Sequence, residues 1–587
     1  MSRRPRPPIQ RADLRWWSIP PLLLTLAAFA APALSPRSDP DVWWHLKAGT
    51  EFISGGPLPF RDTWSCTTPG HPWINHEWLA EVCFASARRA AGEGGVVLLA
   101  AAIAAIAAGL IVRAALREGL PAWLIAFLSC LAALAITDRL LPRPQLFTYL
   151  FFALFLERIG AMRHGASPWA LPIIQIFWTN LHGPWIGLAA GSLLLLGGGV
   201  PTLSWKRRWF LIALVGLASL AHPQAYRVLI EPLANVFRGD VYHQTIQEWQ
   251  PIQRLLPRVI PQAPATALLM MAGALAAILA FLTRRGRRMW GYPVLLLALS
   301  LAPLLSNRHR DLVAVAFVPV LAVLFGDRLS RVSGRWVAAL CSGLAIVFLL
   351  VPEAGWLGYP SAWPWTLRLS RANCPEAAVA FLNKEDIGSR MFNAYDYGGF
   401  LVDQVHRKRL DFIDGRLLVD ERVYEEYLDV RDGGDGAQSI LDRYHIDLLV
   451  IRYPQPGGYQ NLAREARDWP EWALVFWDDT TLIYARRDRV EGGWLAAHAY
   501  RWLDPTLPSP MRARAYWVDH YGDLIREAER AALDAPLAAR PVLSLALAHE
   551  YNGHIDAAAR DYRRVLEMHP ENRPAREGLN RVNDARR

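Results

Sequence analysis

Hydrophobic residues dominate the chain from about residue 16 to residue 352, where they form long runs separated by short clusters of charged residues. The runs are rich in Leu, Ala, Val and Ile, and helices of that length cross a hydrocarbon core of about 30 Å when they tilt and their end residues reach the surface. The pattern predicts a polytopic membrane bundle of about eleven helical spans. We place them at residues 16–35, 96–112, 120–137, 144–159, 168–180, 184–200, 209–222, 264–283, 290–306, 311–326 and 336–352.

The pattern changes after the last run to the shorter alternation that is typical of soluble domains. Short strands alternate with amphipathic helices between 353 and 490, which predicts a small exterior α/β domain. Residues 491–587 are helical in pattern, and the stretch 545–570 resembles one helical pair of a tetratricopeptide (TPR) repeat, with a capping helical hairpin as the alternative. The expected fold class is therefore mostly α: a membrane bundle at 1–352, the α/β domain and a TPR-like helical tail. We expect strands at 390–393, 409–413, 447–452, 472–477 and 481–485, with helices at 375–386, 419–431 and 437–444.

The distribution of charge orients the predicted bundle. The net charge is +10 and the pI is about 9.5, but most of the Arg residues stand at the ends of hydrophobic runs. Membrane orientation explains them better than nucleic-acid binding, and the basic loops place the N-terminus in the cytoplasm and the C-terminal domain outside. The basic residues before the first run could also belong to a signal peptide, but no small-residue cleavage site follows, so we expect an uncleaved anchor.

The first exterior loop, residues 36–95, holds the main candidate chemistry. Asp39 before a proline predicts a helix start, and the amphipathic stretch 40–53 with its paired tryptophans predicts a helix that lies at the membrane surface. Asp41 and His45 are four residues apart and share one face of this helix. Capping is the ordinary role of such an aspartate. We favour a catalytic role for Asp39, Asp41 and His45, because polar groups at a membrane surface are costly unless they are used or solvated.

A second group of polar residues closes the same loop. Asn75 predicts the start of another helix, and Glu77 and Glu81 share one face of it, with His76 beside them. His76 and Glu77 are candidates for substrate binding, and an ordinary solvated helix face is the alternative.

Other exterior ends of spans supply basic residues that could bind a phosphate. Arginine suits this task because its guanidinium donates two parallel hydrogen bonds. Pairing with Asp138 and Asp311, or contact with lipid headgroups, is the alternative role, and a lone histidine at the end of a span is more often structural. The loop 223–263, which contains Glu248, could cover a site or simply connect two spans. The candidates are Arg139, Arg143, His182, His222, Arg308, His309 and Arg310.

Several chemistries find no support in the sequence. The region after the bundle has no GxGxxG and no P-loop, so a nucleotide site is not expected, and no Cys or His spacing suggests structural zinc. Two carboxylates at short spacing can hold a hard divalent cation, so Asp39 and Asp41 are the candidate ligands for Mg²⁺ or Mn²⁺.

An acidic pair after the first span, an interfacial helix, a bundle of about a dozen crossings and an exterior C-terminal domain together resemble the GT-C glycosyltransferases. Arg143-Pro144-Gln145, Asn180-Leu181-His182-Gly183 and Phe412-Ile413-Asp414-Gly415-Arg416 are similar to bacterial membrane proteins described as glycosyltransferase-like. The resemblance covers roughly residues 14–450.

The resemblance implies a transferase in a bacterial inner membrane, with its C-terminal domain in the periplasm. Such enzymes take a sugar from a polyprenyl-phosphate donor in the membrane and transfer it to an exterior glycan, lipid or protein acceptor. Asp39 or Asp41 would act on the acceptor, and the arginines would hold the donor phosphate. The helical tail could recruit a protein partner, and no nucleic-acid partner is expected. The rival interpretation is a noncatalytic membrane scaffold or a lipid-glycan transporter that keeps the bundle.

Overall fold

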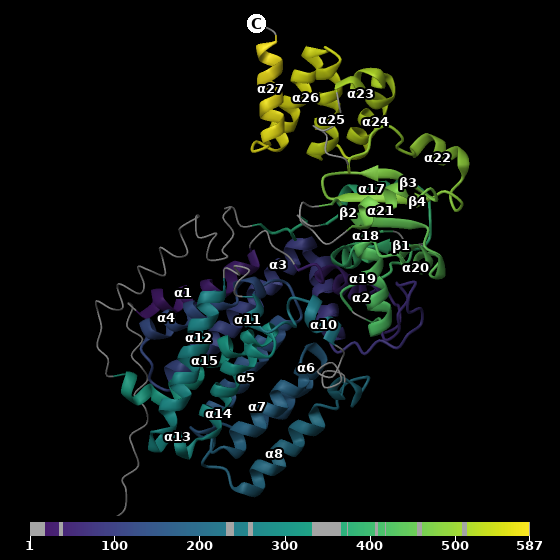
Figure 1. The fold of residues 1–587 in the computed structure, drawn as a ribbon. Coiled ribbons are helices and arrows are strands. Elements are labelled where there is room, and N and C mark those ends of the chain that lie inside the picture. Colours follow the sequence, from purple (N-terminus) through teal and green to yellow (C-terminus); the bar gives the residue numbers. More distant parts are fainter. Residues whose placement is uncertain are drawn as a thin grey trace, which may run out of the picture. The chain divides into compact units, whose positions relative to one another are not determined.

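The chain divides into two compact units (Figure 1). Unit 1 contains Met1–Phe60 and Ile74–Ser370, and unit 2 contains Arg61–Trp73 and Arg371–Arg587. The structure is a computed structural model, and it describes residues 18–34, 39–230, 240–255, 262–330, 366–371, 374–405, 409–416, 418–454, 461–506 and 514–585.

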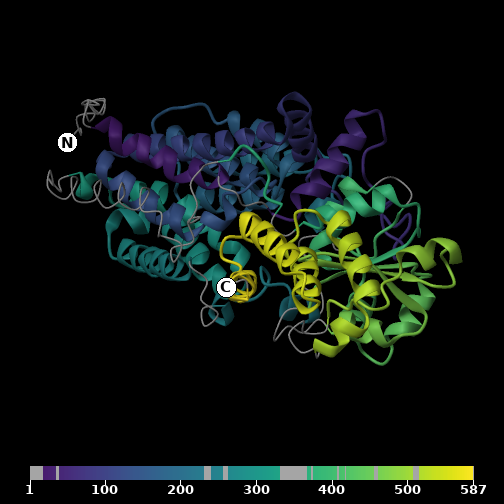
Figure 2. The same ribbon diagram turned by 90° about the horizontal axis from the view of Figure 1, so that it is seen from above.

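The helices of unit 1 follow the hydrophobic runs of the sequence, and they gather into one bundle (Figures 1 and 2). Ten of the eleven predicted spans coincide with helices, and the eleventh, at 336–352, lies outside the described residues. The helices are α1 (Ile19–Ala30), α2 (Val42–Ile53), α3 (Trp78–Arg117), α4 (Ala122–Ala135), α5 (Gln145–Met162), α6 (Ala170–Leu181), α7 (Pro184–Leu196), α8 (Trp205–Ala218), α10 (Asp240–Thr245), α11 (Ile252–Leu255), α12 (Ala263–Phe281), α13 (Arg284–Arg288), α14 (Gly291–Leu301) and α15 (Arg310–Leu329).

Helix α15 lies inside the bundle, where it packs against α3, α4, α5, α12 and α14. Its residues from Arg310 to Val320 are all buried, because a helix that is hydrophobic on every side is stable only when neighbours cover it. Helix α3 is interrupted at Ala91 and Gly92, whose backbone angles are not helical. The interruption separates a first part that contains charged residues from the long apolar part that follows.

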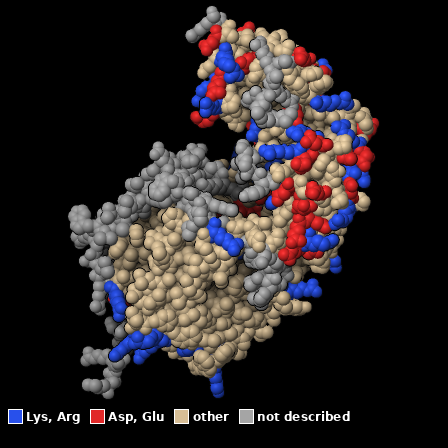
Figure 3. All heavy atoms as spheres, viewed as in Figure 1, with Lys and Arg blue, Asp and Glu red and all other residues tan. Residues whose placement is uncertain are grey.

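The surface of unit 1 matches a protein that sits in lipid. Leu217, Met271 and Leu282 are more than 60% exposed, although large contiguous hydrophobic surfaces are rare on soluble monomers. Figure 3 shows a broad face of this unit with almost no charged residue and with Lys and Arg along its lower edge. Among the described residues, four helical segments are long and apolar enough to cross a membrane: Trp78–Arg117, Gln145–Met162, Ala263–Phe281 and Asn307–Leu329. The chain is a membrane protein, and the number of its spans stays a prediction.

Unit 2 contains a four-stranded sheet with the order β1-β2-β4-β3. Strand β1 (Met391–Asn393) is parallel to β2 (Leu448–Arg452), whereas β4 (Thr481–Arg486) is antiparallel to both β2 and β3 (Trp472–Trp477). Nearly every strand residue is buried, so both faces of the sheet are covered. The helices nearby are α17 (Glu376–Lys384), α18 (Gly398–Gln404), α19 (Glu421–Asp432), α20 (Ala437–Arg443), α21 (Leu462–Asp468) and α22 (Gly492–His498).

The strand expected at 409–413 is wrong, because that segment forms isolated bridges instead of a ladder. One bridge joins Leu410 to Arg390, and the other joins Asp411 to Ser65 in the short segment Arg61–Trp73. In the second bridge the Cys66 N–H donates to the carbonyl of Asp411 at 2.8 Å. Part of the loop that the sequence predicts to be exterior, residues 36–95, therefore belongs to unit 2, a division that the sequence did not suggest.

The tail of unit 2 consists of helices that pack in sequence order, α24 on α25, α25 on α26 and α26 on α27 (Figures 1 and 2). Helices α25 and α26 occupy the stretch that resembles a TPR pair, and Tyr562 is buried in their core. The TPR assignment itself stays a prediction. The tail helices are α23 (Arg514–Asp519), α24 (Tyr521–Asp534), α25 (Ala539–Tyr551), α26 (Ile555–Met568) and α27 (Arg573–Asp584).

Candidate functional site

The residues just before α2 are arranged around its N-terminus. The side chain of Asp39 accepts a hydrogen bond from the Asp41 N–H at 2.9 Å, so Asp39 orders the chain that enters the helix. Asp41 occupies the N-cap position, but its side chain accepts no capping hydrogen bond. The side chain of Asp41 is 31% exposed, which leaves it accessible to a substrate. Capping therefore explains part of the role of Asp39 and does not explain Asp41.

Arginines from the loop between α4 and α5 contact these carboxylates. Arg143 Nε lies 3.2 Å from Asp39 Oδ2, and Arg143 Nη2 lies 3.6 Å from Asp41 Oδ2. A third carboxylate, Glu248, lies 2.8 Å from Arg143 Nη1 and 2.7 Å from Arg139 Nη1. We call Asp39, Asp41, Arg139, Arg143 and Glu248 the arginine cluster. Its three carboxylates and two guanidinium groups lie in one place, although they come from three separate loops.

Two acids of the arginine cluster, Asp41 and Glu248, have pKa values that are shifted in opposite directions. Burial raises the pKa of Asp41 well above its usual value, with a further increase from Asp39, and Arg143 offsets part of this effect. Burial also opposes ionisation of Glu248, but Arg143, Arg139 and Arg308 lower its pKa below the usual range. Glu248 is therefore a fixed anion, whereas Asp41 takes up a proton more readily than an ordinary aspartate.

Glu77 lies among imidazoles. His76 Nε2 is 3.1 Å and His182 Nε2 is 3.3 Å from Glu77 Oε1, and His45 Nε2 is 3.6 Å from Glu77 Oε2. The second nitrogen of His45, Nδ1, lies 3.5 Å from Glu81 Oε1. We call His45, His76, Glu77, Glu81 and His182 the histidine cluster. The structure thus brings His45 to Glu77 and Glu81 rather than to Arg143.

Hydrogen bonds outside the histidine cluster fix its geometry. Asn75 Nδ2 donates to Glu81 Oε2 at 2.8 Å, and Asn75 Oδ1 accepts from the Glu77 N–H at 3.1 Å, so Asn75 orders the start of α3 as expected. Thr148 Oγ1 lies 2.7 Å from His182 Nδ1 and donates to the carbonyl of His182 at 3.0 Å. In the tautomer that donates from Nδ1 to this hydroxyl, His182 Nε2 carries the lone pair that a metal ligand needs.

Burial keeps two of these histidines neutral. It lowers the pKa of His45 to about 3 and that of His182 to about 3, although Glu77 acts in the opposite direction on both. Burial also opposes ionisation of Glu77, but His76, His45 and His182 lower its pKa below the usual range. A lone pair on His182 Nε2 then faces an ionised oxygen of Glu77, and such a contact is favourable when a cation lies between the two atoms.

The histidine cluster fits a metal ion. Among the described residues, His76, Glu77 and His182 are the group of three whose ligand atoms all lie within 4.8 Å of one another. Two imidazoles and one carboxylate are a donor set that transition metals accept, and the bond from Thr148 to His182 is the outer contact that usually orients a histidine ligand. In the arginine cluster, by contrast, Arg143 already contacts both Asp39 and Asp41.

The remaining candidate residues are divided between the site and the bundle interior. Arg308 lies over the ring of Trp249 at 6.0 Å, and its N–H donates to the carbonyl of Glu248 at 3.1 Å. His309 is half-buried one position further on. Arg310 is 1% exposed and forms an ion pair with Asp138, as the alternative interpretation of these arginines anticipated. His222 Nδ1 accepts from the Gln224 N–H at 3.0 Å, which is a structural contact.

No protein-family model matches the chain, and no curated protein matches it either. A crystal structure of ArnT from Cupriavidus metallidurans bound to undecaprenyl phosphate is similar at 14% sequence identity, with a TM-score of 0.46. The match covers 82% of this chain and 99% of that chain. A likeness at this level carries no argument about activity, which has to come from the residues of the chain itself.

Thr148 is a contact that the sequence did not single out, and Glu248 was named only as part of a loop that could cover a site. Glu248 lies in a long connecting segment without periodicity, and Thr148 lies within a hydrophobic helix where a threonine has many structural roles. Charge was the available signal for Glu248, since an acidic residue between predicted spans needs a cationic partner. Together the two clusters offer a proton acceptor, two buried cations for an anionic group and a set of metal ligands.

Proposed function

We propose that this chain is a GT-C-type membrane glycosyltransferase that moves a sugar from a polyprenyl-phosphate donor to a glycan, lipid or protein acceptor. The reaction would occur at the exterior face of a bacterial inner membrane, with the N-terminus in the cytoplasm. The mostly helical membrane fold, the sequence motifs and the arginine cluster support this function.

One observation carries the proposal: a carboxyl with a raised pKa, Asp41, lies 3.6 Å from the guanidinium of Arg143 and is partly exposed. A transferase needs a base near the acceptor and a fixed cation near the leaving phosphate, and these two residues meet both needs. Arg139 adds a second buried guanidinium, held in place by Glu248.

The reaction assigns a separate task to each side of the cluster. The acceptor O–H bond breaks, its proton goes to a carboxylate oxygen of Asp41, and the acceptor oxygen bonds to the anomeric carbon. The bond from that carbon to the phosphate oxygen breaks, and its electron pair leaves with the polyprenyl phosphate. Arg139 and Arg143 balance the charge on this phosphate, and Asp39 holds Arg143 in position.

A divalent cation would be held by His76, Glu77 and His182, with Asp39 and Asp41 as the predicted alternative ligands for Mg²⁺ or Mn²⁺. When bound, such an ion supplies positive charge for an anionic substrate. Neutral imidazoles favour Zn²⁺ or Mn²⁺ over Mg²⁺, because Mg²⁺ prefers oxygen ligands. The residues of the histidine cluster would orient that ion, and His45 would remain beside it on α2.

The decisive experiment compares wild type with Asp41→Asn and Asp39→Asn in cells at matched protein levels. Surface glycans and the lipid-linked sugar pool are measured by mass spectrometry. Loss of the base is expected to lower transfer about 10²- to 10⁴-fold in Asp41→Asn and to leave the donor accumulated. Asp39→Asn should lose less, since it positions Arg143. Asp523→Asn, a change in the solvent-exposed part of α24, is the control.

Unchanged glycans in both variants would reject the transferase and favour the noncatalytic scaffold or transporter. A scaffold would instead lose its effect when the helical tail is removed while Asp41 is kept, and the same glycan measurement distinguishes the two cases.

A further inference from the structure

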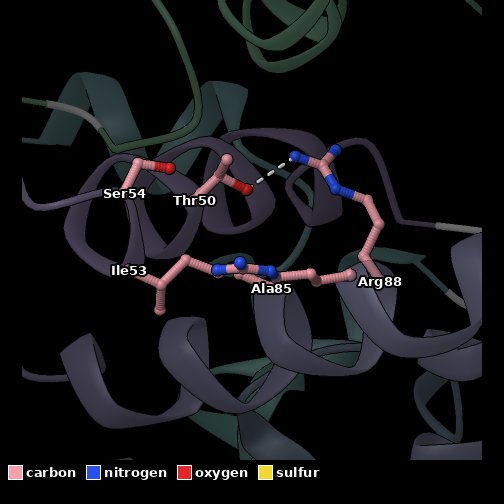
Figure 4. Close-up of a pocket in the computed structure, with 6 residues that line it drawn as sticks. Thr50, Ile53, Ser54, Ala85 and Arg88 are labelled. Carbon is pink, nitrogen blue, oxygen red and sulfur yellow. Dashed lines mark hydrogen bonds between the residues drawn. The ribbon is translucent and has the colours of Figure 1, made fainter.

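A groove with a volume of about 490 Å³ lies between the end of α2 and the first part of α3 (Figure 4). The groove is separate from the arginine cluster, because Asp39 and Asp41 precede the opposite, N-terminal end of α2. None of the residues assigned above to transfer or to metal binding lines it. Its lining residues are Thr50, Ile53, Ser54, Ala85, Arg88 and Arg89.

The groove exists because α2 and α3 touch at one level and separate at the next. A Cβ on Gly49 would lie 2.1 Å from the carbonyl oxygen of Glu81, so the two helices are in direct contact there. One turn further along, the larger side chains of Ile53 and Arg89 face the space between the helices. The close contact that forms the narrow end of the groove therefore requires a glycine at position 49.

Arg88 is fixed at the rim of the groove. Its Nη2 donates to Thr50 Oγ1 at 2.8 Å and reaches the carbonyl of Leu46 at 3.4 Å (Figure 4). Thr50 Oγ1 in turn donates to the same carbonyl at 2.5 Å, so the guanidinium is tied to α2 by a hydroxyl and a backbone oxygen. Helix α2 has no basic residue in its own last turn, and Arg88 supplies positive charge near that end.

Arg89 has a different environment from Arg88. It is exposed, it lines the groove, and among the described residues no carboxylate forms an ion pair with it. The exposed hydroxyl of Ser54 lies on the opposite wall, and Ile53 and Ala85 provide apolar surface between the polar groups. The groove thus combines two guanidinium groups, two hydroxyls and a small apolar area.

We propose that this groove binds a phosphate-bearing group, either the headgroup of an anionic lipid or a free phosphate. Guanidinium groups bind phosphate oxygens through paired hydrogen bonds, and the Ser54 hydroxyl can donate to an oxygen that remains, since the Thr50 proton is already donated to the carbonyl of Leu46. The location fits a molecule at the membrane surface, because Arg88 and Arg89 stand just before the interruption at Ala91 and Gly92, after which the apolar part of α3 begins. Basic residues at this boundary attract anionic headgroups.

The test measures binding to the full-length detergent-solubilised protein by native mass spectrometry. Three probes are used: short-chain phosphatidylglycerol, phosphatidylcholine with the same chains, and inorganic phosphate. Arg89→Gln is expected to raise the dissociation constant of the bound probe about tenfold, because it removes one charge-assisted pair of hydrogen bonds. Arg89→Lys keeps the charge and should lose less. Arg563→Gln, which removes an exposed arginine from α26, is the matched control.

Each outcome decides a point. A loss confined to phosphatidylglycerol identifies a lipid headgroup, and a loss that includes inorganic phosphate identifies the phosphate itself. Equal binding of every probe to wild type and Arg89→Gln, or an equal loss in Arg563→Gln, would overturn the proposal. Thr50→Val with Ser54→Ala is the second variant, since it removes both hydroxyls and keeps the charge. Asp41→Asn should bind like wild type, so failure here is distinguishable from failure of the proposed transfer.

Discussion

Carboxylates near Arg143 and carboxylates near His182 lie in the same unit, but their nitrogen-containing neighbours are of different kinds. In the arginine cluster, two guanidinium groups that stay charged at every accessible pH contact Asp39, Asp41 and Glu248. In the histidine cluster, Glu77 contacts three imidazoles, of which His45 and His182 have a pKa of about 3.

The difference determines what each cluster can bind. Fixed guanidinium charge suits an anion such as a phosphate, and it leaves no lone pair for a metal. His45 and His182 are neutral and have lone pairs. Burial opposes protonation of His76, but Glu77 raises its pKa, so a metal ion at this cluster competes with a proton on His76. One helix, α2, thus borders the arginine cluster through Asp41 and the histidine cluster through His45. The following predictions test this division.

The largest effect on stability is expected for Arg143→Gln. Arg143 is 12% exposed and contacts Asp39, Asp41 and Glu248, so its removal leaves three carboxylates facing one another. Loss of one partner from a buried ionic group costs about 3–5 kcal/mol. The thermal unfolding midpoint of the detergent-solubilised Arg143→Gln protein should fall clearly below that of wild type. The midpoint of Arg143→Lys should lie between those of wild type and Arg143→Gln, since an ammonium group keeps the charge without the planar fork.

Arg452→Gln provides the comparison for this prediction. Arg452 pairs with the half-exposed Asp396 at 2.8 Å in unit 2, and exposed pairs contribute about 0–1 kcal/mol. If Arg143→Gln unfolds at the same temperature as Arg452→Gln, Arg143 is not the residue that holds the three carboxylates together.

The sequence was sufficient for the parts of the site that are local. Hydrophobic length placed most helices of unit 1, and the run from Asp39 to His45 predicted the start of α2 to within two residues, since the N-cap is Asp41 and not Asp39. Charge at the ends of spans found Arg143 and His182. What each residue contacts was not predictable, since Arg143 and Glu248 are 105 residues apart and their pairing depends on how helices pack.

The division of the first exterior loop shows the same limit. Thr67 donates to the carbonyl of Phe412 across 345 residues, and Ser65 bridges to Asp411 in a segment without a repeated pattern. The strand expected at 409–413 was wrong because Leu410 and Asp411 bridge to two different segments, at Arg390 and at Ser65, and a local pattern does not show which segment each residue will meet. Asp62, which forms an ion pair with Arg416 at 3.0 Å, looked like one more acidic residue of an exterior loop.

A smaller effect is expected when the metal ligands are perturbed from outside. Thr148→Val removes the hydroxyl that fixes His182 Nδ1, and outer contacts of this kind change metal affinity about 10- to 100-fold. Glu77→Gln removes a ligand and should lower the bound metal further. Metal per protein is measured by elemental mass spectrometry after dialysis against Zn²⁺, Mn²⁺ or Mg²⁺.

Asp39→Asn and Asp41→Asn are the counterparts of this measurement. They should leave the bound metal unchanged if the histidine cluster holds it. Loss of metal in these two variants, with Glu77→Gln still loaded, would place the ion in the arginine cluster and reverse the division between the two sites.

The smallest effect is the pH dependence of stability at His222, which is 7% exposed and lies outside both clusters. Burial, with a further contribution from His76, lowers its pKa from 6.5 to about 4. The unfolded chain therefore binds a proton at a higher pH than the folded chain, and stability is lost as the pH falls from 6.5 towards 4. His222→Asn should reduce this loss, which corresponds to a midpoint shift of about 2–4 °C.

Asp41 in the arginine cluster should change stability with pH in the opposite direction to His222, so the same measurement distinguishes the two residues. Because burial and Asp39 raise the pKa of Asp41, its contribution to stability is present at low pH and is lost as the pH rises through the raised value. Asp41→Asn should therefore steepen the loss of stability on acidification, because it removes a group whose protonation favours the folded state, whereas His222→Asn flattens it. Identical acid limbs in wild type and His222→Asn would mean that the pKa of His222 is the same in the folded and the unfolded protein, so that burial and His76 do not disfavour its charged form.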